Sequence, residues 1–427
     1  MRYLIALVVA VMTSHGVADG EVTVGWRTDG TGLYPSARPP TNWTETEHVI
    51  WKAPTEAWSN ASPVVIADRV FVLGERSTLL CLDVGTGRVM WQASNEYEEV
   101  LGPVEEIQAG LDEQKPELEQ ELDALEQQIA AFDATGRRAK RKLRRIKQQA
   151  DQLREMIEGS QLLELPSTHG DNGYSSATPL SDGKHIWAIF GTGTVVCYDV
   201  YGRRLWARLL EKPTHGWGHS ASPKMIDGKL IVSVRDLFAL DPLTGRTIWR
   251  TDSEQHWGTP AVTHIGEMGV ILTTAGQVVR AADGTVLAQD LPVMKWNGPH
   301  VVEGKVYFIE DNASAFEIPE AVTEPLKLKE LWSTRVAGSR HYASPLVYNS
   351  FVYTISREST MSVLDAKTGQ LVYEQTMELG KGNSVYTSLS MAGNLIYAGS
   401  MTGEIVLFKP GRQYKEVARN QLEPFRS

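Results

Sequence analysis

The sequence predicts an all-β fold, a β-propeller of four-stranded blades that carries an inserted antiparallel α-helical coiled-coil hairpin. Two observations predict the propeller: a strand–turn–strand segment occurs four times almost without gaps, and a short opening motif occurs seven times. A third observation, a stretch of apolar residues at heptad spacing, predicts the hairpin. With 42% apolar and 22% charged residues, the chain of 427 residues has an ordinary globular composition.

The four copies of the strand–turn–strand segment share one physical pattern. Alternating apolar residues lead to an Asp, then a Gly-containing turn, then a strand with a large aromatic residue. The Asp can accept hydrogen bonds from N–H groups of its own turn, the Gly supplies the positive φ, and the aromatic covers the buried face of the strand. The copies are LLCLDVGTGRVMWQ (79–92), VVCYDVYGRRLWAR (195–208), LFALDPLTGRTIWRT (237–251) and MSVLDAKTGQLVYEQ (361–375). Their key residues are Asp83, Asp199, Asp241 and Asp365; Gly87, Gly202, Gly245 and Gly369; and Trp91, Trp206, Trp249 and Tyr373.

The opening motif is a small residue, often followed by Ser and Pro, at the start of an apolar strand. One more strand lies between the two markers, so each repeat holds four short strands in about 40 residues, the content of one propeller blade. The seven openers are ASPVV at 61, ATPLS at 177, ASPKM at 221, GTPAV at 258, GPHVV at 298, ASPLV at 343 and TSLSM at 387.

The number of blades does not follow directly from the seven openers. The segment at 48–52, which contains Trp51, has the pattern of an outer strand but precedes the first opener, and the tail at 420–427 resembles a junction to another opener. We therefore predict an eight-blade layout whose last blade is reduced to the Trp51 strand, with a gap or an unpaired edge beside it. The alternative is a seven-blade ring with the Trp51 strand added as a fifth strand on one blade.

The repeat resembles the pyrroloquinoline-quinone-type (PQQ-type) propeller repeat, in which a strand ends in Leu-Asp, a Thr-Gly turn follows, and the outer strand carries a Trp. The resemblance covers residues 45–420 apart from one insertion. It implies a family that includes quinone-dependent alcohol dehydrogenases, the propeller scaffold of the outer-membrane β-barrel assembly machinery, and many secreted propellers. The opening GWRTDGTGLYP followed by NWTETEHVIWKAP is most similar to this last group.

The insertion at 103–158 is rich in Glu, Gln, Leu, Lys and Arg. Its apolar residues form two heptad seams, so we expect an antiparallel helical hairpin that turns at 133–136. The seams are Leu118, Leu122, Leu125, Ile129 and Phe132 in the first arm, and Leu143, Ile146, Ala150, Leu153 and Ile157 in the second. The first arm carries ten acidic residues and one Lys, whereas the second, from Arg137 to Arg154, carries nine basic residues and one Asp.

The charge of the second arm has two interpretations. A nucleic acid or an anionic lipid surface would suit the basic stretch at 137–147. Pairing with the acidic first arm is the simpler account, because flanking charges commonly set helix pairing. The net charge of −10 also argues against a nucleic-acid partner. We therefore expect the arm to contact a protein partner.

The first 18 residues have the pattern of a cleaved signal peptide. Arg2 gives a positive start, 4–12 an apolar run too short to span a bilayer, and Gly16 and Ala18 the small residues of a cleavage site. This predicts a periplasmic or extracellular protein without a transmembrane segment. The predicted parts are the signal peptide (1–18), an N-terminal segment with the first blade (19–102), the helical insertion (103–158) and the remaining blades (159–427).

The residues just before the openers predict a binding surface. In a propeller the opener strands line the central channel, so the segments before them converge at one rim although they lie about 40 residues apart in the chain. Aromatic residues with a few polar groups on a concave surface are typical of a binding site, whereas packing between blades is the structural alternative. The candidate residues of this funnel are Trp58, Asn60, His169, Asn172, Tyr174, Trp217, His219, His256, Trp257, Lys295, Trp296, Asn297, Arg340, His341 and Tyr386.

No motif in the sequence predicts catalysis. His215 and His219 are four residues apart, but Gly216 and Gly218 argue against a helix that would present them together to a metal. The quinone-dependent dehydrogenases of the family use an adjacent Cys-Cys pair beside their cofactor and an Asp base near calcium. Here Cys81 and Cys197 occupy one equivalent position in two blades, which favours apolar packing. We expect no cofactor.

Two functional hypotheses remain open. The first is a non-catalytic scaffold that binds a protein or a small ligand. The second is a PQQ-type oxidoreductase, or another enzyme that works in the His- and Trp-rich funnel.

Overall fold

The computed structural model describes residues 3–5, 23–55, 58–102, 104–132, 137–158, 164–323, 325–380 and 384–422. The chain divides into two compact units. One comprises Met1–Asn95 and Pro166–Ser427, and the other is Glu96–Leu165. Both parts of the predicted fold class, the four-stranded blades and the inserted helices, are confirmed.

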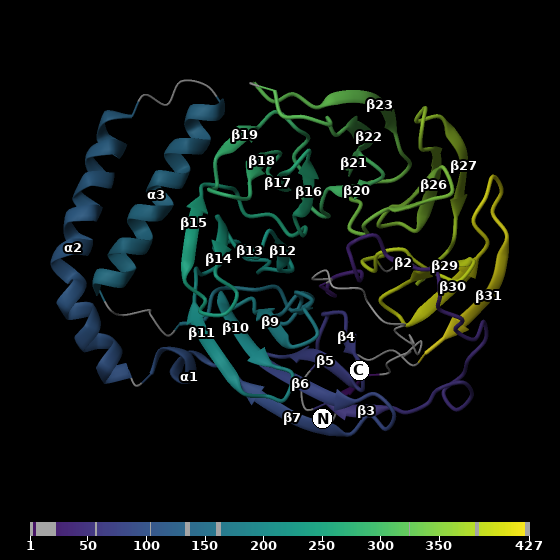
Figure 1. The fold of residues 1–427 in the computed structure, drawn as a ribbon, viewed down its shortest axis with the longest axis horizontal. Coiled ribbons are helices and arrows are strands. Elements are labelled where there is room, and N and C mark those ends of the chain that lie inside the picture. Colours follow the sequence, from purple (N-terminus) through teal and green to yellow (C-terminus); the bar gives the residue numbers. More distant parts are fainter. Residues whose placement is uncertain are drawn as a thin grey trace. The chain divides into compact units, whose positions relative to one another are not determined.

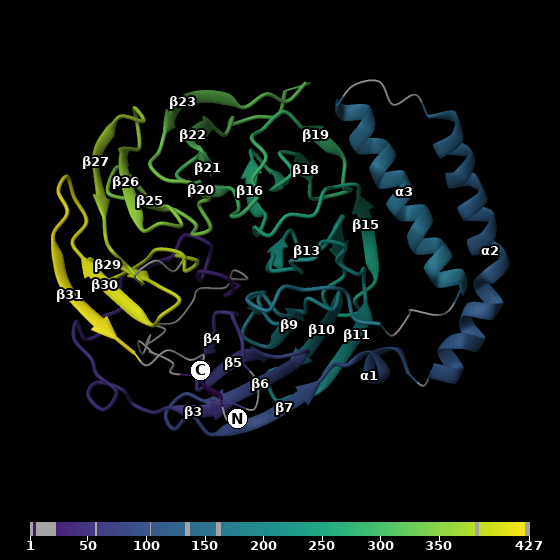
Figure 2. The ribbon, with the colours of Figure 1, turned by 180° about the vertical axis from the view of Figure 1, so that it is seen from behind.

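The first unit contains seven blade-type sheets in its described part, one for each opener. Figure 1 shows them following one another around a common axis, and Figure 2 shows the same order from behind. In each blade the four strands pair in chain order, with the opener strand at the inner edge. Blade 1 is β4 (Val64–Ile66), β5 (Arg69–Gly74), β6 (Thr78–Asp83) and β7 (Val89–Ser94); blade 2 is β8 (Leu180–Ser181), β9 (His185–Ile189), β10 (Thr194–Asp199) and β11 (Arg204–Leu209); blade 3 is β12 (Lys224–Ile226), β13 (Lys229–Ser233), β14 (Leu237–Leu240) and β15 (Thr247–Thr251). Blade 4 is β16 (Ala261–Ile265), β17 (Met268–Leu272), β18 (Val278–Arg280) and β19 (Val286–Ala288); blade 5 is β20 (His300–Val302), β21 (Lys305–Ile309), β22 (Asn312–Glu317) and β23 (Lys329–Arg335). Blade 6 is β24 (Leu346–Tyr348), β25 (Phe351–Ile355), β26 (Thr360–Asp365) and β27 (Leu371–Thr376); blade 7 is β28 (Ser390–Ala392), β29 (Leu395–Gly399), β30 (Glu404–Phe408) and β31 (Glu416–Gln421).

The repeated Asp and Gly form the predicted turn between the third and fourth strands. In blade 1, Asp83 accepts hydrogen bonds from the N–H (2.8 Å) and the hydroxyl (2.6 Å) of Thr86. Gly87 has φ +70°, and its three counterparts are also positive. These bonds stabilise the ionised Asp83 carboxylate and hold its pKa below the ordinary value.

Four outer strands, those of blades 1, 2, 3 and 5, carry a Trp that packs on the turn of the next blade. Trp91 donates to the carbonyl oxygen of Val200 (3.2 Å), and Trp206 to that of Pro242 (2.8 Å). Trp249 and Trp332 repeat the arrangement with the next blade in each case. Within its own blade, Trp91 lies opposite Cys81 and is preceded by a bulge at Met90. The small residue opposite the indole explains why Cys and Ala share this position.

The hydroxyl of the opener joins successive blades at their inner strands. The Ser62 N–H donates to the Thr178 hydroxyl (3.2 Å), Thr178 N–H to Ser222 (2.9 Å), and Ser222 N–H to Thr259 (3.0 Å). Ser344 and Ser388 form the same bond between blades 6 and 7. The Ser or Thr before the opener Pro is therefore an inter-blade connector.

Six apolar clusters lie between successive blades, from blades 1 and 2 through to blades 6 and 7. Among the described residues, no such cluster joins blade 7 to blade 1. Trp43 instead packs on blade 7 with Leu395 and Leu407, whereas Trp51 and Ala53 pack on blade 1. The N-terminal segment therefore covers the two flanks that an eighth blade would cover.

The eight-blade prediction is wrong about the outer strand at 48–52. Residues 48–52 form no strand, because the regular pairing begins later, at β3 (Ala53–Thr55), whose partner is β1 (Tyr3–Ile5). The alternative is also wrong, because the fifth strand of blade 7 is β2 (Leu33–Tyr34), which pairs in parallel with β28. The end of the tail, 423–427, lies outside the described residues.

Residues 23–34, which we call the axial segment, run along inner edges of the blades. Val24 pairs with Ser181 of β8 through two backbone hydrogen bonds of 2.8 Å. Arg27 Nη2 donates to the carbonyl oxygen of Leu389 (2.7 Å), next to β28, where β2 then pairs. Figures 1 and 2 both show this purple chain among the inner strands. The chain itself therefore occupies part of the centre of the ring.

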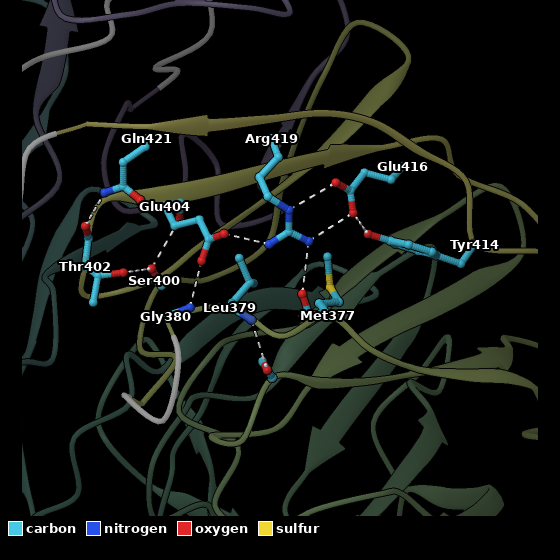
Figure 3. Close-up of polar contacts among 11 residues, drawn as sticks. Met377, Leu379, Gly380, Ser400, Thr402, Glu404, Tyr414, Glu416, Arg419 and Gln421 are labelled. Carbon is cyan, nitrogen blue, oxygen red and sulfur yellow. Dashed lines mark hydrogen bonds and ion pairs between the residues drawn. The ribbon is translucent and has the colours of Figure 1, made fainter.

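An ionic network fastens the outer strand of blade 7. Arg419 contacts Glu404 (2.7 Å) and Glu416 (3.0 Å) and donates to the carbonyl oxygen of Met377 (3.1 Å), at the end of blade 6 (Figure 3). Glu404 also accepts from Gly380 N–H (2.8 Å). One guanidinium therefore holds β31 to the chain that leaves blade 6.

The second unit contains α1 (Tyr97–Leu101), α2 (Val104–Ala131) and α3 (Arg137–Glu158). The two long helices lie within the predicted insertion, and their predicted turn at 133–136 lies outside the described residues. Ile146, Ala150 and Leu153 of the predicted seam are buried. Arg154 of α3 contacts Glu126 of α2 at 2.5 Å, as expected for oppositely charged arms.

The predicted signal peptide lies outside the described residues except for β1. No described helix is both long and apolar enough to cross a bilayer.

Candidate functional site

A row of aromatic rings runs along the segments before the openers, from blade 2 to blade 7. His169 stacks on Trp217 with ring centroids 3.7 Å apart, and His215 meets Trp257 edge-on at 4.7 Å. Trp257 stacks on Trp296 at 5.1 Å with an interplanar angle of 13°. The row continues from Trp296 to Tyr342 (5.3 Å, edge-on) and from Tyr342 to Tyr386 (4.6 Å, stacked). The predicted convergence of these segments is therefore present in the structure.

The row is accessible along its length. Trp217 is 42% exposed and Tyr386 is 37% exposed, whereas Trp257, Trp296 and Tyr342 are half-buried. Rings that stack on one another lose little further freedom when they bind, and exposed large aromatics are typical of protein-binding surfaces. We call His169, His215, Trp217, Trp257, Trp296, Tyr342 and Tyr386 the aromatic row.

The repeat explains the position of four rings in this row. Trp257, Trp296 and Tyr342 each stand three residues before the Pro of their opener, and Tyr386 stands three before Leu389, which replaces that Pro. In blades 1 to 3 the same position holds polar residues, Asn60, Ser176 and Ser220.

Tyr342 and His215 were not among the predicted funnel residues. Counting back from the Pro of the opener would have found Tyr342. The prediction instead selected Arg340 and His341 in that blade. For His215 the sequence holds no such signal, because its contact with Trp257 depends on the course of a loop.

The second group of predicted residues connects backbones between blades. Asn60 Nδ2 donates to the carbonyl oxygen of Asp171 (2.6 Å), and Asn172 Nδ2 to that of Trp217 (2.7 Å). Asn297 Nδ2 donates to the carbonyl oxygens of Ile309 (2.9 Å) and His341 (2.6 Å). For these residues the packing alternative describes the structure better than a binding surface.

The predicted histidines at these junctions differ in burial. His219 is buried and its Nε2 bonds the carbonyl oxygen of Ser233 (2.7 Å); burial lowers the pKa of its imidazole to about 4. His341 is also buried, and burial lowers its pKa. Both rings are therefore neutral at pH 7. His256 is half-buried, and His169 is exposed.

The remaining predicted residues surround the row. Tyr174 donates its hydroxyl to the carbonyl oxygen of Pro166 (2.8 Å), which holds its ring in the loop before blade 2. Trp58 is half-buried, and its ring edge lies near Gly173. Lys295 is exposed, and the exposed Arg340 places its guanidinium 5.6 Å from the Trp296 ring centre. The row therefore has cations beside it in blade 5 and blade 6.

Half-buried carboxylates hold the loops that carry the row. Glu310 accepts a hydrogen bond from Lys295 N–H (2.6 Å), and Glu75 accepts from Tyr174 N–H (2.6 Å) and Ser175 N–H (2.7 Å). Burial raises the pKa of both carboxyl groups, although these hydrogen bonds oppose the shift. These carboxylates therefore position the backbone of the loops.

The side chains present do not fit a quinone site with calcium. Cys81 and Cys197 lie in β6 and β10, each facing the Trp of its own blade, and burial raises the pKa of both thiols to about 12. Within the described part of the chain, no three His, Cys, Asp or Glu side chains gather as metal ligands. His215 and His219 do not converge either, because one is exposed and the other is bound to Ser233.

The comparisons with known proteins agree with the fold. Residues 41–113, 191–302 and 298–413, together more than half of the chain, match a PQQ-type family model described as outer membrane protein assembly factor BamB. No curated protein matches the chain. Among solved structures, BamB from Moraxella catarrhalis is similar with a TM-score of 0.51 and 13% identity, over 86% of this chain and 88% of that chain. A europium-containing methanol dehydrogenase gives a TM-score of 0.47 and 10% identity, over 83% of this chain and 78% of that chain. The chain belongs to the family of outer membrane protein assembly factor BamB, and its fold is a PQQ-type β-propeller.

Proposed function

We propose that this protein is an exported, non-catalytic scaffold that binds a partner protein through the aromatic row. The observation that carries the proposal is the unbroken series of ring contacts, stacked or edge-on, from Trp257 through Trp296 and Tyr342 to Tyr386. A packed row of half-exposed aromatics buries a large area on binding at a small cost in side-chain entropy. The family description, an outer-membrane assembly factor, supports a location in the cell envelope.

The chemistry of the row favours an extended polypeptide as the ligand. Flat ring faces along four successive blades can pack on the aromatic, proline or aliphatic side chains of such a segment. Lys295 and Arg340 stand beside these rings and would attract acidic groups of the partner. Exposed charges of this kind mainly direct association, whereas buried rings supply affinity.

The proposal assigns no cofactor to the protein. The Cys residues serve as small apolar packing groups, and the buried His219 at the rim bonds the backbone of Ser233. A quinone-dependent oxidoreductase remains the competing hypothesis, and a direct binding experiment separates the two.

The first test compares partner recovery by a variant of the aromatic row with recovery by a variant of an aromatic residue outside the row. Trp257→Ala combined with Trp296→Ala should lower partner recovery from native envelopes at least about tenfold, as expected when two hot-spot rings are removed. Tyr201→Ala is the control, because Tyr201 is 75% exposed on a turn of blade 2 outside the row. Photo-crosslinking from position 217 should then label the same partner. Equal recovery from the rim variant and the control would contradict the proposal.

The second test addresses the competing hypothesis. The purified protein is mixed with pyrroloquinoline quinone and calcium and then passed through a gel-filtration column. Quinone absorbance that travels with the protein would overturn the non-catalytic assignment, and its absence from the protein peak is the expected result.

A further inference from the structure

Three basic side chains meet at the centre of the ring. Arg27 belongs to the axial segment, Lys224 to the inner strand of blade 3, and His300 to the inner strand of blade 5. Their exposed fractions are only 6%, 8% and 3%. Arg27 Cζ and Lys224 Nζ lie 5.4 Å and 5.5 Å from the centre of the same Trp26 ring, so both cations lie beside that indole.

These groups lack the partners that burial normally demands. Among the described residues, the Arg27 guanidinium makes one hydrogen bond, to the carbonyl oxygen of Leu389, whereas its Nε and Nη1 have no partner there. His300 Nε2 likewise has none within that part of the chain. An unsatisfied buried polar atom costs about 1–3 kcal/mol, and an unpaired buried charge costs more. Several such donors in one place are suited to an acceptor that brings negative charge.

The nearest acidic side chain does not neutralise the cluster. Asp29 is close enough to raise the pKa of both Arg27 and Lys224, but its carboxylate is exposed and accepts from Thr31 N–H (2.8 Å) and the Thr31 hydroxyl (2.6 Å). Burial is the larger influence, and it lowers the pKa of Arg27 to about 10 and that of Lys224 to about 8. Both side chains still carry positive charge at pH 7.

The local sequence makes room for the two cations. A Cβ atom at Gly32 would lie 2.5 Å from Arg27 Nη2, and a Cβ at Gly30 would lie 3.1 Å from Lys224 Nζ. Both glycines have positive φ, +74° and +103°, which bends the axial segment around these groups. Residues 26–32, Trp-Arg-Thr-Asp-Gly-Thr-Gly, thus build one side of the cluster.

We propose that Arg27, Lys224 and His300 form a binding site for a small oxyanion, a carboxylate or phosphate, at the centre of the ring. Arg and Lys offer only donors, and charge-assisted hydrogen bonds from them to carboxylate or phosphate are the strong ones. Such an anion would satisfy the free nitrogens of Arg27 and offset the buried positive charge of Arg27 and Lys224. It would also fasten the axial segment to blades 3 and 5.

The site is tested on the full chain, purified in chloride buffer and titrated at constant ionic strength with inorganic phosphate or with acetate. Saturable binding by calorimetry and a rise in Tm are expected with one of the two, and the better ligand identifies the anion class. Arg27→Gln and Lys224→Met should each weaken that binding at least about tenfold. The control, Lys367→Met, removes an exposed cation and should leave the affinity unchanged.

A second measurement keeps the test valid if Arg27→Gln does not fold. In chloride buffer, Lys224→Met should raise Tm, because it removes a buried charge and keeps the apolar stem. Adding phosphate or acetate should then reduce the difference in Tm between Lys224→Met and the wild type, because the anion stabilises only the wild type. The proposal is wrong if neither anion binds saturably, or if binding is equal in the wild type and Lys224→Met. Failure here leaves the aromatic row untouched, because no member of that row belongs to this cluster.

Discussion

The indole nitrogen of Trp51 donates a hydrogen bond to the carbonyl oxygen of Val84 at 2.8 Å. The ring also lies against Gly87, where an added Cβ would stand 2.4 Å from Trp51 Cε3. Trp91, Trp206, Trp249 and Trp332 make the same bond to the turn of the next blade. Trp51 therefore acts on blade 1 as the outer strand of a preceding blade would, without being part of a strand.

This relationship predicts that Trp51 stabilises the closure of the ring. Trp51→Ala should lower the free energy of unfolding by about 2–4 kcal/mol, slightly less than for a fully buried aromatic, because the ring is half-buried. Trp51→Phe should cost less, because it keeps apolar contact and loses the hydrogen bond, which contributes about 1 kcal/mol. Urea unfolding of the three proteins measures both differences. An unchanged midpoint for Trp51→Ala would show that the N-terminal segment does not close the ring.

Alanine substitutions at two turn glycines should lower stability by different amounts. Gly245 has φ +70°, and a Cβ there would lie 2.6 Å from Cε3 of Trp206. Gly228 has φ +67°, but a Cβ there would meet nothing within 4 Å. Gly228→Ala should therefore cost only the backbone strain, about 1–2 kcal/mol. Gly245→Ala should cost about 1–3 kcal/mol more, because it also displaces the indole.

Thermal unfolding of the two alanine variants measures this difference. Equal Tm values would mean that the Trp206 ring moves aside freely, and the inter-blade role of the outer-strand Trp would then be minor.

The sequence was sufficient for the blades because their determinants are local. Asp83, Gly87 and Trp91 lie within one segment, and the same spacing recurs along the chain. The axial segment has no such repeat, since Arg27 bonds Leu389 across 362 residues of chain, and nothing near Arg27 in the sequence indicates that contact. The predicted funnel residues contain two kinds of side chain that the sequence does not separate: rings that contact one another, such as Trp257 and Trp296, and connectors such as Asn297, which bonds backbone.

The junction histidines predict acid sensitivity near neutral pH. The pKa of His219 is about 4 in the folded protein, against an ordinary 6.5, because burial disfavours its charged form. Between these pH values the unfolded chain binds a proton that the folded chain does not. The contribution of neutral His219 to stability is therefore complete above pH 6.5 and is lost as the pH falls toward 4, by up to about 3 kcal/mol.

His219→Gln is the variant that isolates this effect, because its amide can still donate to Ser233 and does not titrate. Urea unfolding at pH 7.5 and at pH 4.5 should show a smaller loss of stability in the variant than in the wild type. Raised pKa values of Glu75 and Glu310 act in the opposite direction in both proteins and cancel in the comparison. Identical pH profiles would show that the His219 ring titrates normally.

We predict that the propeller folds without the helical insertion. Its apolar seam is internal, since Ile146, Ala150 and Leu153 are buried in a unit that is compact by itself. The flanking chain is ordinary blade structure, with β7 ending at Ser94 and blade 2 opening after Ala177. Replacing residues 103–158 with a short Gly-Ser linker should therefore leave Tm within a few degrees, as measured by circular dichroism and differential scanning calorimetry. Loop closure over such a linker costs little, because its entropy grows only slowly with length. Aggregation of the shortened protein, or a large fall in Tm, would show instead that the propeller depends on the helices for its own stability.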